Sequence, residues 1–294
     1  MTFRITFLGT GGGRHTSMFQ TRCTGGMLIE HGDPVMRMHV DPGPGALTQM
    51  RRIRYDVGST DSVVISHAHP DHYSDGPCVI EGMTRGGWVK RGHLYGSPTV
   101  IEGEGGLGPC LSPYHLGLPI SSTAFRPGDV LDIDGQRVEI CRARHSDPTN
   151  VGFRFDTPFG VVSYVSDTDY DEDIGRQYIG SRVLILPVTT PHNNRINYHM
   201  CTDTAIEMVD QVKPELCIFT HLGIVMIEEG PDAQAEMCQD ATGVRTVAGK
   251  DLMVLDVGED LELSQARTYD GEWIPEWAPK LPEKYRYGGQ KGNF

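Results

Sequence analysis

Four side chains that commonly bind metal ions stand within six consecutive residues: His67, His69, Asp71 and His72. They follow the apolar run 62–65, which is typical of a buried strand. In an extended chain, residues two apart face the same side, so His67 and His69 can bind one ion together. Pro70 then turns the chain and directs Asp71 and His72 toward a second ion. The spacing therefore favours a two-metal site over a solvated polar loop without metal.

The composition limits the partners of such a site. The chain has 294 residues, of which 38% are hydrophobic, enough for one large domain with a sizeable core. Its 26 basic and 39 acidic residues give a net charge of −13, which disfavours binding of extended nucleic acid. Because salt screens charges beyond about 8 Å, a locally positive metal cleft could still bind a small anionic ester.

The cysteines and the start of the chain indicate a cytoplasmic protein. Seven cysteines without a C-x-x-C pair form an odd set that cannot close completely into internal disulfides, so we expect reduced thiols. Residues 1–7 alternate like a strand, whereas a secretory signal needs a basic start and an unbroken apolar stretch. No apolar run has the length needed to span a bilayer, so no membrane association is expected.

Strand patterns dominate both halves of the chain, with helical patterns between them. The predicted strands are 3–8, 26–30, 35–40, 62–66, 137–143, 152–156, 161–166, 182–187, 216–220 and 252–256. The predicted helices are 46–54, 202–212 and 232–241, the second opened by a cap at Cys201-Thr202-Asp203. This mixture predicts an α/β fold.

Further ligand-type residues stand where predicted strands end. Asp41, His145, Asp167 and His221 each follow an apolar or alternating run. Strand ends can meet at one rim of a sheet, where sites are assembled on rigid scaffolds. Each residue alone is more simply explained as a turn residue. Together with the histidine cluster, the four favour a shared site.

The chain resembles the metallo-β-lactamase superfamily. The resemblance rests on Gly9-Thr10-Gly11-Gly12-Gly13, Asp41-Pro42-Gly43, the H-x-H-x-D-H cluster, His145, Ser166-Asp167-Thr168 and Thr220-His221. The pattern is closest to ribonuclease Z-like and cyclic phosphodiesterase members. It implies a four-layer αββα sandwich, in which two mixed β-sheets face each other with helices outside and metals at one edge.

The resemblance also implies roles for individual residues. His67, His69 and His145 would hold a first ion, and Asp71, His72 and His221 a second. Asp167 would bridge both ions, opposite a hydroxide, and Asp41 would fix the ligand loop by hydrogen bonds. Zinc suits the nitrogen-rich ligand set, and manganese or iron also fit the carboxylates.

Two residues are candidates for the chemistry itself. Asp71 is assigned a catalytic role beside its role as a ligand. A leaving alkoxide needs a proton, and His199 is the candidate donor. The segment from His199 to Ala205 resembles the histidine and capped helix with which ribonuclease Z and related phosphodiesterases reach the scissile phosphate. The alternative is a surface histidine beside a helix cap.

The glycine-rich stretch 9–13 is a candidate for substrate binding, with Gly12, Gly13, Arg14 and His15 as its members. Consecutive glycines let backbone amides turn toward an anion, and a nearby guanidinium could hold a phosphate. The alternative is a tight turn between strands. A dinucleotide site is disfavoured, because no capped helix is expected to follow and the spacing is wrong.

Two less regular regions complete the chain. Residues 86–119 are rich in glycine and proline and are expected to form a loop, which either overhangs the cleft or only connects elements. Residues 1–266 are expected to form the hydrolase domain. Residues 267–294, with Trp277, Tyr285 and Tyr287, would pack on that domain or reach a partner subunit, which leaves a homodimer open. The sequence lacks the basic arm with which ribonuclease Z grips transfer RNA.

Three functions remain open. The first is a dinuclear metal-dependent phosphodiesterase acting on small nucleotides, cyclic phosphates or, less favoured, RNA ends. The second is a lactone or thioester hydrolase that uses the same metals with an apolar pocket. The third is a redox or sensing member of the fold, disfavoured by the full ligand set. Five further histidines are interpreted as structural: His31, His39, His93, His115 and His192. Of these, His192 is the one whose turn could also face the site.

Overall fold

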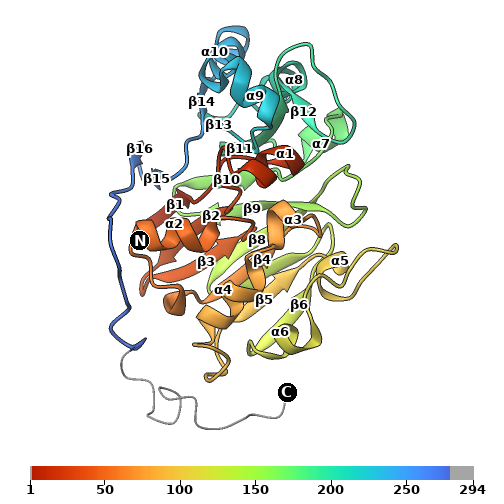
Figure 1. The fold of residues 1–294 in the computed structure, drawn as a ribbon. Coiled ribbons are helices and arrows are strands. Elements are labelled where there is room, and N and C mark those ends of the chain that lie inside the picture. Colours follow the sequence, from red (N-terminus) through yellow and green to blue (C-terminus); the bar gives the residue numbers. More distant parts are fainter. Residues whose placement is uncertain (1, 279–294) are drawn as a thin grey trace.

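A computed structural model of the chain describes residues 2–278. Two large mixed sheets lie face to face, and helices cover both outer faces (Figure 1). This arrangement confirms the predicted four-layer αββα sandwich. Each predicted strand and helix is present, with its ends shifted by at most three residues.

The first sheet combines an antiparallel and a parallel half. Its strands, in spatial order, are β16 (Leu261–Gln265), β15 (Met253–Val257), β1 (Thr2–Phe7), β2 (Met27–Gly32), β3 (Met36–Val40), β4 (Ser62–Ile65), β5 (His93–Gly96) and β6 (Ser121–Ala124). Neighbours from β16 to β3 pair antiparallel, and those from β3 to β6 pair parallel. The carboxyl ends of β3 and β4 therefore point to the same rim.

The second sheet has the same mixed character. Its strands are β14 (Arg245–Ala248), β13 (Leu216–Thr220), β11 (Ser181–Thr190), β10 (Gly160–Tyr164), β9 (Val151–Thr157), β8 (Gln136–Arg142) and β7 (Val130–Ile133), with the short β12 (Met200–Cys201) beside β11. Strands β10, β11, β13 and β14 run parallel, and β7 to β10 alternate in direction.

The helices are short and lie outside the sheets. They are α1 (Gly13–Phe19), α2 (Ala46–Arg52), α3 (Pro70–Tyr73), α4 (Gly76–Met83), α5 (Pro98–Ile101), α6 (Pro113–Gly117), α7 (Glu172–Arg176), α8 (Thr202–Val212), α9 (Ile224–Glu229) and α10 (Pro231–Thr242), with a 3₁₀ turn η1 (Val57–Ser59). Buried side chains of α2 and α4 pack on the first sheet, and those of α7, α8 and α10 pack on the second. No described helix is long and apolar enough to cross a membrane.

Side-chain periodicity explains the layers. In β1, Phe3, Ile5 and Phe7 alternate onto one face and enter the core between the sheets. In the central strand β11, Ile185 enters that core while Leu186 packs under α8 on the other face. A strand buried on both faces needs an unbroken apolar run, which β11 has.

Two sequence predictions are wrong in detail. The glycine-rich stretch does not turn directly between strands, because helix α1 begins at Gly13. Its N-cap, Gly12, has no side chain to accept a hydrogen bond, so the start lacks the usual cap signal. Residues 86–119 are not a single loop, because β5, α5 and α6 lie within them. These elements have four or five residues each, too few for a clear periodic pattern.

The described part of the C-terminal extension contacts the first half of the chain. The amide of Tyr269 donates to the carbonyl of Arg52, and the Tyr269 ring lies under the guanidinium of Arg54 at 4.3 Å. The indole N–H of Trp277 donates to the carboxylate of Asp56 at 2.9 Å. Residues 279–294, including Tyr285 and Tyr287, lie outside the described residues.

Candidate metal centre

Strand ends from both sheets bring the predicted ligands to one rim. Asp41 follows β3 and the histidine cluster follows β4 in the first sheet, whereas Asp167 follows β10 and His221 follows β13 in the second. Asp41, Ser166 and His221 have φ of 53°, 57° and 53°, in the left-handed region that non-glycine residues rarely adopt. Each redirects the chain directly after or near a strand end, and such conformations cluster at functional sites.

The first group of converging side chains is His67, His69, His145 and Asp167. One nitrogen or oxygen from each lies within 4.8 Å of the others. Nε2 of His145 is 3.0 Å from Nδ1 of His69, and Oδ2 of Asp167 is 3.9 Å from the same Nε2. Three imidazoles and a carboxylate therefore surround one point, an arrangement compatible with a divalent metal ion.

The second group is Asp71, His72 and His221. Nε2 of His221 is 3.3 Å from Oδ2 of Asp71, and Nε2 of His72 is 3.7 Å from the same oxygen. Oδ2 of Asp167 also reaches this group, at 3.0 Å from His221 and 3.5 Å from His72. The structure thus brings together all seven predicted ligands, with one oxygen of Asp167 between the two groups.

Unpartnered buried atoms show that the cluster fits cations. Among the described residues, Nε2 of His67, Nε2 of His72 and Oδ1 of Asp167 are buried without a hydrogen bond. Leaving buried polar atoms unpaired costs about 1–3 kcal/mol each, so such atoms need an explanation. Two imidazole nitrogens and a carboxylate oxygen without partners are the atoms that a divalent cation would bind, so the cluster is compatible with a metal site.

The opposite ring nitrogens are held by the protein. In the first group, Nδ1 of His67 lies 3.0 Å from Ser66 Oγ, and Nδ1 of His145 lies 3.0 Å from the carbonyl oxygen of Tyr198. In the second group, Nδ1 of His72 lies 3.0 Å from the Asp41 carboxylate, and Nδ1 of His221 lies 3.0 Å from Thr189 Oγ1. Such contacts fix the tautomer and the orientation of a metal-binding imidazole. Each of the four rings therefore presents Nε2 to the centre.

Asp41 contacts the loop that follows β4. Its carboxylate accepts hydrogen bonds from the amide of Ser66 at 2.7 Å and the hydroxyl of Ser66 at 2.8 Å. It also contacts His72 Nδ1 and accepts from the hydroxyl of Tyr164 at 2.9 Å. Tyr164 was not identified from sequence, because a tyrosine inside β10 carries no signal beyond an ordinary core residue.

Electrostatics divide the histidines into two kinds. Burial lowers the pKa of His145 to about 4, so this imidazole is neutral near pH 7 and can bind a cation. Burial also lowers the pKa of His221, but the carboxylates of Asp167 and Asp71 more than compensate and raise it to about 9. Burial raises the pKa of Asp167, yet His221 and His72 hold it well below its usual value. The cluster therefore retains carboxylate charge for a cation.

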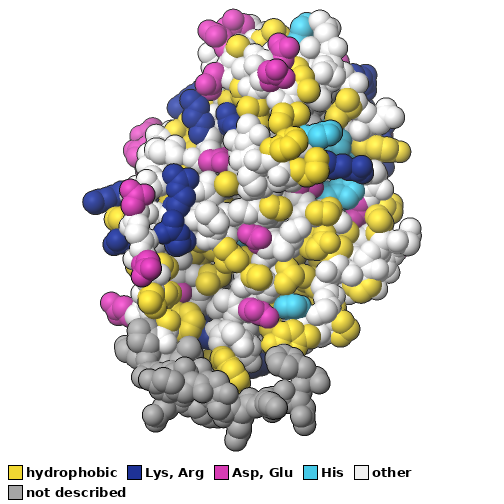
Figure 2. All heavy atoms as spheres, in the orientation of Figure 1, with side chains coloured by type: hydrophobic (Ala, Val, Ile, Leu, Met, Phe, Trp, Pro, Cys, Tyr) yellow, Lys and Arg dark blue, Asp and Glu magenta, His cyan; other side chains and the backbone are white. Residues whose placement is uncertain are grey.

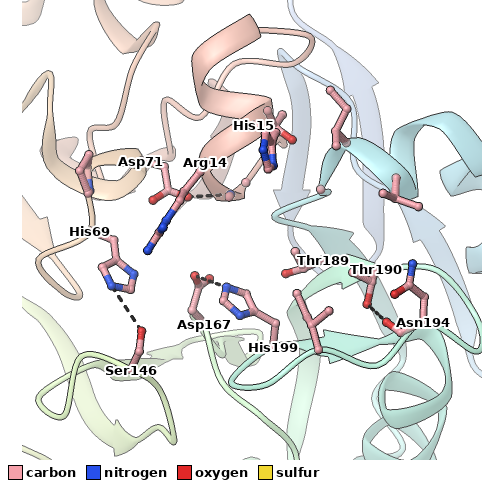
Figure 3. Close-up of a pocket in the computed structure, with 18 residues that line it drawn as sticks. Arg14, His15, His69, Asp71, Ser146, Asp167, Thr189, Thr190, Asn194 and His199 are labelled. Carbon is pink, nitrogen blue, oxygen red and sulfur yellow. Dashed lines mark hydrogen bonds and ion pairs between the residues drawn. The ribbon is translucent and has the colours of Figure 1, made fainter.

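A pocket of about 430 Å³ opens beside the cluster. Asp71, Asp167 and His69 line one side, and Ile196, Ile224 and Val225 contribute apolar surface. Figure 3 shows His199 directed at Asp167, with His199 Nε2 3.5 Å from Asp167 Oδ2. Figure 2 shows histidine, basic and hydrophobic side chains gathered on this part of the surface, near α1.

Arg14 and His15 line the same pocket from α1. In Figure 3 the side chain of Arg14 extends into the pocket between Asp71 and Asp167. Among residues 2–278 it makes no hydrogen bond or ion pair. Its five N–H donors are therefore available to a ligand.

The glycine-rich turn has a different role from the predicted anion-binding nest. The amide of Gly13 donates to Asp71 Oδ2 at 2.7 Å, that of Gly12 to the Leu222 carbonyl, and that of Gly11 to the Cys23 carbonyl. These amides are not free for an anion. A Cβ at Gly12 would lie 2.2 Å from the His221 ring, so glycine allows close packing against the candidate ligand. Sequence could not reveal these partners, because most are distant along the chain.

The other histidines do not line this pocket. Nδ1 of His192 lies 2.7 Å from a carboxylate oxygen of Asp203, whereas Thr189, Thr190 and Asn194 from the same segment line the pocket. The remaining four, His31, His39, His93 and His115, contact carbonyl or hydroxyl groups or are buried elsewhere.

Residues 36–222 match the model of the beta-lactamase superfamily domain, so the chain belongs to this metallo-β-lactamase superfamily. An uncharacterized protein of Methanocaldococcus jannaschii is 35% identical over 252 residues, covering 85% of this chain and 93% of that protein. Ribonuclease Z of Methanosarcina acetivorans is 32% identical over 146 residues, about half of this chain and 46% of that enzyme. The pattern of the chain is thus ribonuclease Z-like.

The fold agrees with solved members of the superfamily. The metallo-β-lactamase fold protein YhfI from Bacillus subtilis superposes with a TM-score of 0.73 at 19% identity, covering 87% of this chain and all of that one. At this identity the likeness concerns the fold alone.

Proposed function

We propose that this protein is a dinuclear metal-dependent hydrolase that cleaves phosphodiesters in small nucleotides, cyclic phosphates or, less favoured, RNA ends. The observation that carries the proposal is the placement of His199 and Arg14 in one pocket beside Asp167. A phosphodiester needs a cation for its charged oxygens and a proton for its leaving group. The partial similarity to ribonuclease Z supports phosphodiester chemistry.

The seven converging side chains would hold two divalent ions, with zinc the first expectation and manganese or iron also suited. When bound, such ions supply a water that ionises near neutral pH and positive charge for the substrate oxygens. Asp71 would anchor one ion while its Oδ2 holds the amide of Gly13, which fixes the start of α1 beside the site.

His199 would act on the leaving oxygen. Its Nδ1 donates to the carbonyl of Asn197 at 3.3 Å, which leaves Nε2 facing the pocket. The Asp167 carboxylate lies 3.5 Å from this Nε2, so the imidazole stands beside the candidate metal centre, where a leaving oxygen would form. Because Nε2 also groups with Asp167 and His221, metal content must be measured in any His199 variant.

Arg14 would bind a non-bridging phosphate oxygen, since guanidinium forks match phosphate geometry. The aliphatic side chains Ile196, Ile224 and Val225 would contact the organic part of the ester. This apolar surface is also the observation that favours the second candidate, a lactone or thioester hydrolase.

One activity panel separates the candidates. Purified protein of measured metal content is assayed with bis(p-nitrophenyl) phosphate, a lactone and a thioester, each with zinc, manganese and iron. The proposal expects turnover of the phosphodiester and a strong decrease on Asp167→Ala. Turnover of the lactone or thioester while phosphodiesters stay inert under every metal would instead establish the second candidate.

A further inference from the structure

Another buried carboxylate contacts the histidine loop, residues 66–72. Asp147 is 1% exposed and stands two residues after His145. Its Oδ2 accepts hydrogen bonds from the amide of Ala68 at 2.9 Å and the hydroxyl of Thr99 at 2.7 Å. Its Oδ1 accepts from the amide of Thr149 at 2.9 Å and from the hydroxyl of Thr149 at 3.0 Å.

The amide of Ala68 is the informative contact, because Ala68 lies between His67 and His69. One carboxylate thus ties the peptide that carries two of the converging histidines to the segment that carries the third, His145. His67 and His69 follow β4 of the first sheet and His145 follows β8 of the second, so Asp147 connects segments that come from different sheets. Asp147 thus binds the backbone between His67 and His69, and none of the hydrogen bonds described for its carboxylate goes to a histidine ring.

The hydrogen bonds of Asp147 indicate a role beyond packing. Its two carboxylate oxygens accept four hydrogen bonds from residues 68, 99 and 149, which belong to three separate segments of the chain. An apolar side chain of the same size would fill the space but could not order these segments, because it offers them no acceptor.

Asp41 makes a different set of contacts. It reaches His72 directly and the amide of Ser66 at the start of the loop. Asp41 therefore orients His72 of the second group directly and reaches His67 of the first group only through Ser66. Asp147 instead binds the backbone between His67 and His69.

We propose that Asp147 is a positioning residue for the first ion, setting the spacing of His67, His69 and His145. This inference rests on the proposed metal centre and assigns a residue that the centre itself does not include. In Asp147→Asn the shape is kept, but one acceptor becomes an NH₂ donor facing the N–H or O–H groups that the carboxylate binds. The peptide between His67 and His69 then shifts, and the first ion loses affinity.

The test is a titration of the metal-free protein with Co²⁺, followed by the visible spectrum of each bound ion. His145→Ala and His221→Ala identify the spectra of the first and second sites. We expect Asp147→Asn to weaken the first ion by about 10- to 100-fold and to leave the Kd of the second unchanged. Thr99→Val, which removes one hydrogen bond to Asp147, should weaken the same ion less and serves if Asp147→Asn does not fold.

The contrasting variant is Asp41→Asn, which should weaken the second ion more than the first. Equal weakening of both ions by Asp147→Asn, or no weakening, would overturn the inference while leaving the two-metal centre intact. A wild-type protein that binds no Co²⁺ at this cluster would overturn the centre and the inference together.

Discussion

Nε2 of His221 lies 3.0 Å from Oδ2 of Asp167, and both groups are buried. This contact joins a side chain at the end of β13 to one at the end of β10. Together with Asp71, Asp167 raises the pKa of His221 to about 9, although burial opposes this shift. The same carboxylate oxygen lies within 4.0 Å of His67, so it faces both groups of the centre.

Metal binding should therefore release protons. At pH 7 the metal-free protein holds a proton on His221, because its pKa of about 9 lies above that pH. A metal ion needs the neutral imidazole, so binding must displace this proton, and the apparent affinity should rise with pH up to about pH 9. Burial lowers the pKa of His72 in the same group, yet Asp167 and Asp71 raise it well above its usual value, so binding of this ion should displace a second proton. Calorimetric titrations with zinc in two buffers of different ionisation enthalpy measure the protons released. Buffer-independent heats would contradict the shift.

Replacing His199 with alanine should lower kcat most for substrates with poor leaving groups. We expect kcat for an alkyl phosphodiester to fall about 10²- to 10⁴-fold, the usual contribution of general acid catalysis. The decrease should be much smaller for bis(p-nitrophenyl) phosphate, since p-nitrophenolate leaves with little protonation. Metal content should stay at two ions per chain. If metal is lost, or both substrates slow equally, His199 is a ligand or a structural residue and not the acid.

Arg14→Gln should raise KM for a phosphodiester while leaving KM for a neutral lactone unchanged. We expect an increase of about tenfold, the effect of losing one charge-assisted hydrogen bond of roughly 1.5 kcal/mol. Arg14→Lys retains the charge and should recover part of the loss. Arg137→Gln, an exposed arginine on β8, is the matched control. An unchanged phosphodiester KM in Arg14→Gln would remove Arg14 from the substrate site.

His39 gives a pH dependence independent of metal. Its Nε2 donates to the carbonyl of Gly25 at 2.8 Å, and burial lowers its pKa from 6.5 to about 4. Between pH 6.5 and 4 the unfolded chain binds a proton that the folded protein does not, so the free energy of unfolding falls as the pH falls. The loss is on the order of 3 kcal/mol and is complete below pH 4.

His39→Gln keeps a donor for Gly25 and lacks the titrating ring. The test is urea unfolding of the metal-free wild-type protein and of this variant, each at about pH 4.5 and about pH 7.5. The pH-dependent difference in unfolding free energy should be smaller in the variant. Identical pH dependence in both proteins would show that His39 does not titrate on unfolding.

The sequence alone could locate those site residues that follow a strand with a clear hydrophobic pattern. Asp41, Asp167 and His221 could be located because the strands before them are apolar or alternating, and strand ends converge at a rim. Helix α1 was missed because it starts at glycines without a side-chain cap. The roles of Gly12 and Asp147 depend on His221 and Ala68, which are remote in the chain, and a single sequence carries no signal for such pairs.

The most direct test of the central claim is anomalous diffraction from crystals grown with zinc, with data on both sides of its absorption edge. We expect two peaks about 3.5–4 Å apart, the usual spacing of a two-metal site, on either side of the Asp167 carboxylate. One peak should lie among His67, His69 and His145, and the other beside His72 and His221. A single peak, or zinc bound away from this cluster, would contradict the dinuclear centre.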